Sequence, residues 1–110
     1  MKDLKIKIPI YNSLVRYIVT DDFINEYKRQ GAKYDDTYNH CHGVSEWING
    51  INTIMIKEKY ENDWSVIAHE VLHATNRILE HVGVEVNTIN DEAQAYLLSY
   101  VIKEIQKHKK

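Results

Sequence analysis

The first apolar pattern in the chain has a period of two. Apolar residues fill every second position near the N-terminus: Leu4, Ile6, Ile8 and Ile10. This alternation is typical of a half-buried β-strand. Pro9 has no amide hydrogen to donate, so the strand is expected to lie at a sheet edge or to break there. A second extended run, residues 14–19, follows a turn predicted at Asn12 and Ser13.

A β-hairpin is predicted in the middle of the chain. Residues 44–56 read VSEWINGINTIMI, with Asn49 and Gly50 between two apolar runs. Both residues tolerate the positive φ angles of a type I′ turn, so the segment is expected to form two antiparallel strands. Residues 33–43, KYDDTYNHCHG, are polar and have no periodicity, so they are expected to form a loop.

Three helices are predicted from apolar residues at helical spacing and from residues that can cap a first turn. The candidate caps are Thr20 or Asp21, Asn62 or Asp63, and Asn90 or Asp91. The helices are expected to end near Gly31, near Gly83 and towards Lys107. Strands and helices together predict one α+β domain that spans residues 1–110.

Length and composition narrow the class of protein. The chain has 110 residues, 44% of them hydrophobic, and a formal net charge of −2. This charge gives no field that would attract nucleic acid or an anionic membrane, so neither is expected as a partner. The single Cys41 excludes an intramolecular disulfide, which fits a reducing cytosol. Neither a signal-peptide pattern nor a membrane-spanning apolar stretch is found, and we expect a soluble, cytoplasmic protein.

Residues 67–74, IAHEVLHA, carry the strongest chemical signal. Each residue of a helix turns by about 100°, so His69 and His73 would point almost the same way. Two imidazoles at this spacing can reach one Zn²⁺. Glu70 would project to the flank of the pair, where it could act as a general base. The alternative is a helix with an ordinary polar face, because the apolar stripe of this helix lies roughly opposite the histidines.

A catalytic zinc site needs a third protein ligand. Glu92, in the segment NDEAQAYLLSY, lies at the start of the last predicted helix. If the polar sides of the last two helices face each other, Glu92 can complete the site with the two histidines. Asp91 is an alternative ligand, although it is better placed as the helix cap. Glu92 could also serve only to favour the positive end of the helix dipole.

These residues carry a resemblance to a known family. HEVLH followed by an acidic residue on the next helix resembles the gluzincin branch of the zincin metallopeptidases, and NDEAQAY is similar to their glutamate helix. The small size resembles minimal gluzincins and the short zincin-like proteins of phage and prophage genomes. The resemblance covers residues 44–105 and implies a zincin-like domain. Such a domain has a small twisted sheet, an N-terminal helix, an active-site helix and a glutamate helix.

The resemblance also implies the roles of individual residues. It implies Zn²⁺ as cofactor, with His69, His73 and Glu92 as ligands and Glu70 as general base and then acid. Tyr96 and His81 are candidates to polarise a substrate carbonyl, since they follow Glu92 and His73 by one and two helical turns.

A second group of potential ligands lies in the predicted loop. His40, Cys41 and His42 are adjacent, and adjacent loop residues point in different directions, so they cannot all bind one ion without distortion. One of them could still enter the cleft and occupy the open zinc position, which would make a latent enzyme.

These observations predict a zinc metallopeptidase that hydrolyses peptide bonds in a peptide or protein substrate. One alternative is a non-enzymatic or latent metal-binding protein that acts through protein–protein contact. Another resembles the repressor-cleaving peptidases of mobile elements, whose E-x-x-A segment residues 92–95 match loosely, although no separate DNA-binding module is seen.

Overall fold

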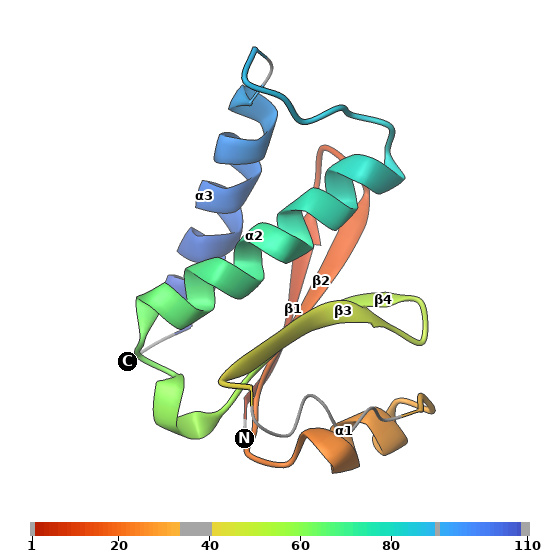
Figure 1. Ribbon diagram of the computed structural model, residues 1–110, viewed down its shortest axis with the longest axis vertical. Helices are drawn as coiled ribbons and strands as arrows, with labels where there is room; N and C mark the ends of the chain where they lie inside the picture. The colour runs from red at the N-terminus through yellow and green to blue at the C-terminus, as the bar shows by residue number, and fades with distance from the viewer. Residues whose placement is uncertain (1, 34–40, 90, 109–110) are drawn as a thin grey trace.

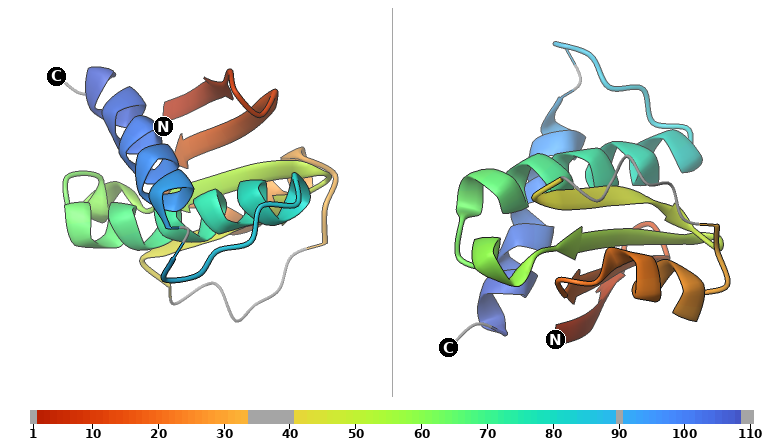
Figure 2. Two further views of the ribbon diagram at one scale, coloured as in Figure 1. Left: turned by 90° about the horizontal axis from the view of Figure 1, so that it is seen from above. Right: turned by 60° about the horizontal axis from the view of Figure 1, so that its bottom comes forward.

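The computed structural model describes residues 2–33, 41–89 and 91–108. A four-stranded sheet of order β1-β2-β4-β3 carries helices on both faces (Figures 1 and 2). The strands are β1 (Lys2–Ile8), β2 (Ser13–Val19), β3 (Gly43–Ile48) and β4 (Ile51–Ile56). The helices are α1 (Phe23–Arg29), α2 (Trp64–His81) and α3 (Glu92–Lys107), with a short 3-10 helix, η2 (Glu58–Tyr60), before α2. The predicted α+β fold class is confirmed.

Two hairpins form the sheet. β1 pairs with β2 and β3 pairs with β4, both antiparallel, and the hairpins join through parallel pairing of β2 with β4. β1 is an edge strand that ends just before Pro9, as predicted. Asn49 and Gly50 have φ angles of 51° and 78°, which confirms the predicted hairpin turn. The other edge is β3, and α2 runs alongside it (Figure 1).

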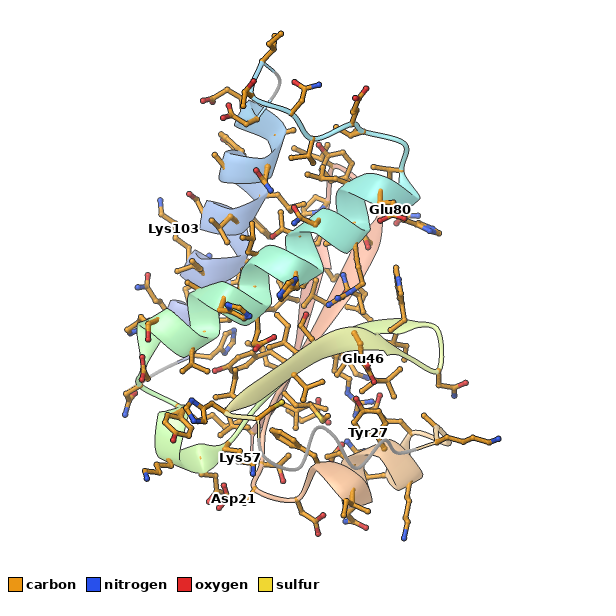
Figure 3. All side chains as sticks on the ribbon, in the orientation of Figure 1. Asp21, Tyr27, Glu46, Lys57, Glu80 and Lys103 are labelled. Carbon is orange, nitrogen blue, oxygen red and sulfur yellow. The ribbon has the colours of Figure 1, made fainter. Side chains whose placement is uncertain are left out.

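The strands alternate their side chains between two apolar clusters. The larger cluster lies between the sheet and helices α2 and α3, and the smaller one lies between the sheet and α1. Thus Ile54 and Ile56 of β4 face α2, whereas Met55 faces α1. Tyr27 of α1 donates a hydrogen bond from its hydroxyl to Glu46 of β3, on the α1 face of the sheet (Figure 3). Within the described residues, no helix is both long and apolar enough to cross a membrane.

The helix caps follow the predictions in part. Asp63 caps α2 by accepting a hydrogen bond from the amide of Ser65 at 3.1 Å, as one of the two predicted candidates. The prediction for α1 is wrong by one or two residues: its cap is Asp22, which accepts from the amide of Asn25 at 3.0 Å. Asp91 stands at the N-cap of α3, but its side chain makes no capping hydrogen bond.

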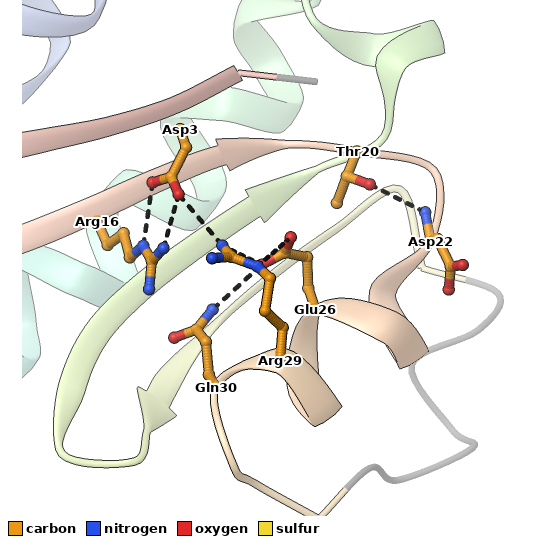
Figure 4. Close-up of polar contacts among 7 residues, drawn as sticks. All are labelled: Asp3, Arg16, Thr20, Asp22, Glu26, Arg29 and Gln30. Carbon is orange, nitrogen blue, oxygen red and sulfur yellow. Dashed lines mark hydrogen bonds and ion pairs between the residues drawn. The ribbon is translucent and has the colours of Figure 1, made fainter.

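A cluster of charged side chains links α1 to the hairpin of β1 and β2 (Figure 4). Asp3 of β1 accepts hydrogen bonds from Arg16 at 3.0 and 2.6 Å and from Arg29 at 3.1 Å. Arg29 also binds the buried carboxylate of Glu26 at 2.8 Å. The hydrogen bonds from Arg16, followed by the charges of both guanidinium groups, lower the pKa of Asp3. The N-terminal strand and α1 are therefore joined by ionised groups as well as by apolar packing.

Candidate metal centre

Three potential ligands lie together on α2. The donor atoms of His69, Glu70 and His73 are all within 4.8 Å of one another. The two imidazole rings have centroids 4.9 Å apart and are exposed, whereas Glu70 is buried. The i, i+4 spacing therefore brings the imidazoles side by side, as predicted, and the group could hold a metal ion.

Glu70 is buried against the beginning of β3. A Cβ atom added to Gly43 would lie 3.0 Å from the Cγ atom of Glu70 and 3.2 Å from the carbonyl oxygen of Met55. The missing side chain of Gly43 is thus what lets the glutamate approach the strand. Burial raises the pKa of Glu70, while electrostatic interactions with His69, His73 and Arg77 oppose the increase. A raised pKa suits a group that must take up a proton.

Arg77 links the same side of α2 to the hairpin of β3 and β4. Its Nη1 donates to the carbonyl oxygen of Ser45 at 2.9 Å, its Nη2 to the hydroxyl of Ser45, and its Nε to Oδ1 of Asn52 at 3.0 Å. Asn52 is buried and donates back to the carbonyl oxygen of Ala74 at 3.0 Å. Neither Gly43 nor Arg77 was among the sequence candidates. Arg77 follows His73 by four residues, so its place on this side of the helix could have been found from the spacing.

A hollow of about 430 Å³ opens beside two of the three potential ligands, His69 and Glu70. It is lined by Cys41, His42, Gly43, Ser65, Val66, His69 and Glu70. The ring of His42 stacks on Tyr60 with centroids 4.1 Å apart, and its carbonyl oxygen accepts from the amide of Lys57 at 3.1 Å. Two members of the predicted second group, Cys41 and His42, therefore reach this hollow, whereas His40 lies outside the described residues.

Glu92 is not part of the group formed by the two histidines and Glu70. Gln94 faces α2, because its amide donates to Oδ1 of Asn76 at 2.6 Å. Glu92 is two residues earlier and so points about 160° away from that contact, given about 100° per residue. Lys103 lines one hollow together with Glu92 and extends from the side of α3 away from α2 (Figure 3). The side of α3 that carries Glu92 and Lys103 is therefore turned away from α2. The sequence prediction required this side to face the histidines of α2.

The remaining sequence candidates also lie apart from the histidine pair. Tyr96 shares the face of Glu92 and is 71% exposed. His81 is the last residue of α2 and contacts the ring of Trp47, with centroids 5.8 Å apart. Asp91 is exposed at the start of α3. The structure thus brings together the three HExxH residues, and it leaves Glu92, Tyr96 and His81 at other places on the helices.

Comparison with known proteins gives no further identification. No family model matches the chain, and neither a curated protein nor a solved structure matches it. The assignment of a metal centre therefore depends on the donor set itself: two imidazoles and one carboxylate converging on one helix.

Proposed function

We propose that the protein is a zinc-dependent hydrolase that cleaves peptide bonds. The observation that carries the proposal is the convergence of His69, Glu70 and His73 within 4.8 Å, with the carboxylate buried between the exposed imidazoles and strand β3. Imidazole nitrogens are preferred zinc ligands, and a zinc site that also acts catalytically keeps one position open. Both imidazoles are exposed and that of His69 lines a hollow, which suits such a site better than a closed structural one.

The three residues would have different roles in peptide hydrolysis. His69 and His73 would hold the ion through one ring nitrogen each. A bound Zn²⁺ would polarise the scissile carbonyl and lower the pKa of a water molecule. Glu70, held against Gly43, would accept a proton at its carboxylate and then deliver it to the leaving amine. Because burial already raises its pKa, Glu70 is suited to both proton transfers.

The third ligand stays a prediction. Glu92 is the candidate from the sequence, and it would have to turn towards α2 to reach the ion. His42 is a second candidate because its ring lines the hollow that His69 and Glu70 also line. Zinc affinity of Glu92→Gln and His42→Ala variants would separate the two: the true ligand is the one whose loss weakens binding by more than the roughly 10–100-fold that loss of a residue merely supporting a ligand costs.

The experiment that tests the function compares Glu70→Gln with His73→Ala. Glu70→Gln should keep zinc and lose hydrolysis of a fluorogenic peptide library, because the amide cannot take up the proton. His73→Ala should lose both. A Glu70→Gln variant as active as the parent would contradict the mechanism.

The contact-based alternative predicts a different result. A latent or non-enzymatic protein would bind zinc but cleave no peptide, and the Glu70→Gln variant would keep its biological effect. The position of Cys41 and His42 beside the candidate site is the observation that favours this second function.

A further inference from the structure

Helix α2 meets the edge strand β3 along one stripe. Alternate residues of β3 contact it: Gly43, Ser45 and Trp47 meet Glu70, Arg77 and His81, respectively. On the helix these three residues lie within about 40° of one another, at about 100° per residue. The stripe lies next to His73, so its contacts determine how the candidate metal centre is oriented relative to β3.

The three contacts differ in how strongly they restrict the orientation of α2 relative to β3. The Gly43 contact is only a close approach, and the Trp47 contact is between tilted rings at 59°. Arg77, in contrast, makes three directional hydrogen bonds, two of them to Ser45 and one to Asn52. All three acceptors are uncharged. A planar guanidinium has its donors in a fixed fork, so it holds a geometry that a flexible ammonium group does not.

We infer that Arg77 is a positioning residue that fixes the rotation of α2 against β3 and thereby places the Glu70 carboxylate. Asn52 completes the link, because it accepts from Arg77 and donates to the carbonyl oxygen of Ala74 on the same helix. The side chains of a helix reach about 5–6 Å from its axis, so a rotation of about 10° moves a carboxylate by roughly 1 Å. The catalytic consequence depends on the proposed function, whereas the placement itself does not.

Arg77 is expected to matter more for turnover than for the pair of histidines that would bind the ion. His69 and His73 both belong to α2, so a rotation of the helix carries them and the ion together and leaves their spacing unchanged. A substrate held against the strand does not move with the helix. Loss of Arg77 should therefore misalign Glu70 with the substrate, and a displacement of about 1 Å lowers kcat by about 10²-fold.

The test uses Arg77→Met, which keeps an unbranched stem but removes the fork, and Arg29→Met as the matched control. Arg29 also joins a helix to the sheet, through its ion pair with Asp3 of β1, but on the α1 face. Nuclear magnetic resonance would follow the contact between the Hα protons of Gly43 and the Hγ protons of Glu70. We expect this contact to weaken strongly in Arg77→Met and to stay unchanged in Arg29→Met, at similar melting temperatures.

A less disruptive variant, Ser45→Ala, keeps the inference testable if Arg77→Met does not fold. Ser45→Ala removes one of the three acceptors and should weaken the Gly43–Glu70 contact without abolishing it. In protein saturated with zinc, Arg77→Met should keep the KM of the parent while kcat falls by about 10²-fold.

Two results would overturn the inference. One is a folded Arg77→Met variant that keeps the Gly43–Glu70 contact, and the other is an equal loss of that contact in Arg29→Met. If the parent binds no zinc, the proposed function fails, but the resonance measurement still decides whether Arg77 positions Glu70.

Discussion

Replacing Gly43 by alanine tests the close approach of Glu70 to β3. The added Cβ would lie 2.9 Å from Cδ1 of Ile56, 3.0 Å from Cγ of Glu70 and 3.2 Å from the carbonyl oxygen of Met55. The end of the Ile56 side chain can move, whereas the carbonyl oxygen of Met55 belongs to the strand backbone. Relief must therefore come largely from Glu70 and the helix that carries it.

The expected size of the effect follows from this crowding. Overpacking of this kind destabilises by about 1–3 kcal/mol, which for a domain of this size lowers the melting temperature by roughly 4–8 °C per kcal/mol. Glu70 would move by a fraction of an ångström or more, and kcat for peptide hydrolysis would fall by up to about 10²-fold. Zinc affinity should change less than kcat, because the added Cβ crowds Glu70 and contacts neither histidine.

Gly83→Ala is the matched control. Gly83 has a φ of 79° and nothing lies within 4 Å of the position of an added Cβ. Alanine there should lower stability by about 1–2 kcal/mol through backbone strain alone and leave kcat unchanged. Urea unfolding, zinc competition and peptide hydrolysis would be measured for both variants. Equal kcat values for Gly43→Ala and the parent would refute the role of Gly43.

Three further predictions concern stability. Asp3 has a lowered pKa in the folded protein, so its contribution to the free energy of unfolding is present above its ordinary pKa of 3.8 and is lost as pH falls through the lowered pKa. Asp3→Asn should remove about 1 kcal/mol of stability at pH 7 and make urea unfolding less dependent on pH between 2 and 5. An unchanged pH dependence would contradict this. The buried hydroxyl of Tyr17 has no hydrogen-bond partner among the described residues, so Tyr17→Phe should stabilise the protein by roughly 1 kcal/mol in urea, whereas destabilisation would indicate a partner such as a buried water. A chelator should lower the melting temperature of the zinc-loaded protein but not that of His73→Ala, since a metal at about 100 times its Kd stabilises by about 2.7 kcal/mol; no shift in the parent would argue against bound metal.

Local patterns predicted the local structure well. Asn49 and Gly50 identified the hairpin of β3 and β4 because a type I′ turn restricts its residues strongly. His69 and His73 share one side of α2 because their spacing alone determines their relative direction. The cap of α1 was misplaced because Thr20, Asp21 and Asp22 are all residue types suited to that position.

Features that depend on distant contacts did not follow from the sequence. The parallel pairing of β2 with β4 joins segments that residues 20–50, with α1 and β3 among them, separate in the sequence, and no local pattern encodes that pairing. Helical periodicity shows that Glu92 and Gln94 lie on different sides of α3, but not which side meets α2. The structure turns Gln94 to α2, through its bond to Asn76. Gly43 has no side chain to give a signal, and its role is visible only from the proximity of Glu70.

The proposed function requires that the HExxH group of α2 binds a metal ion. The most direct measurement is the zinc content of the purified, untagged protein, determined by plasma mass spectrometry beside His73→Ala. We expect about one zinc per chain in the parent and loss of that zinc in the variant. A parent without metal after incubation with zinc, or a variant that keeps its full content, would contradict it.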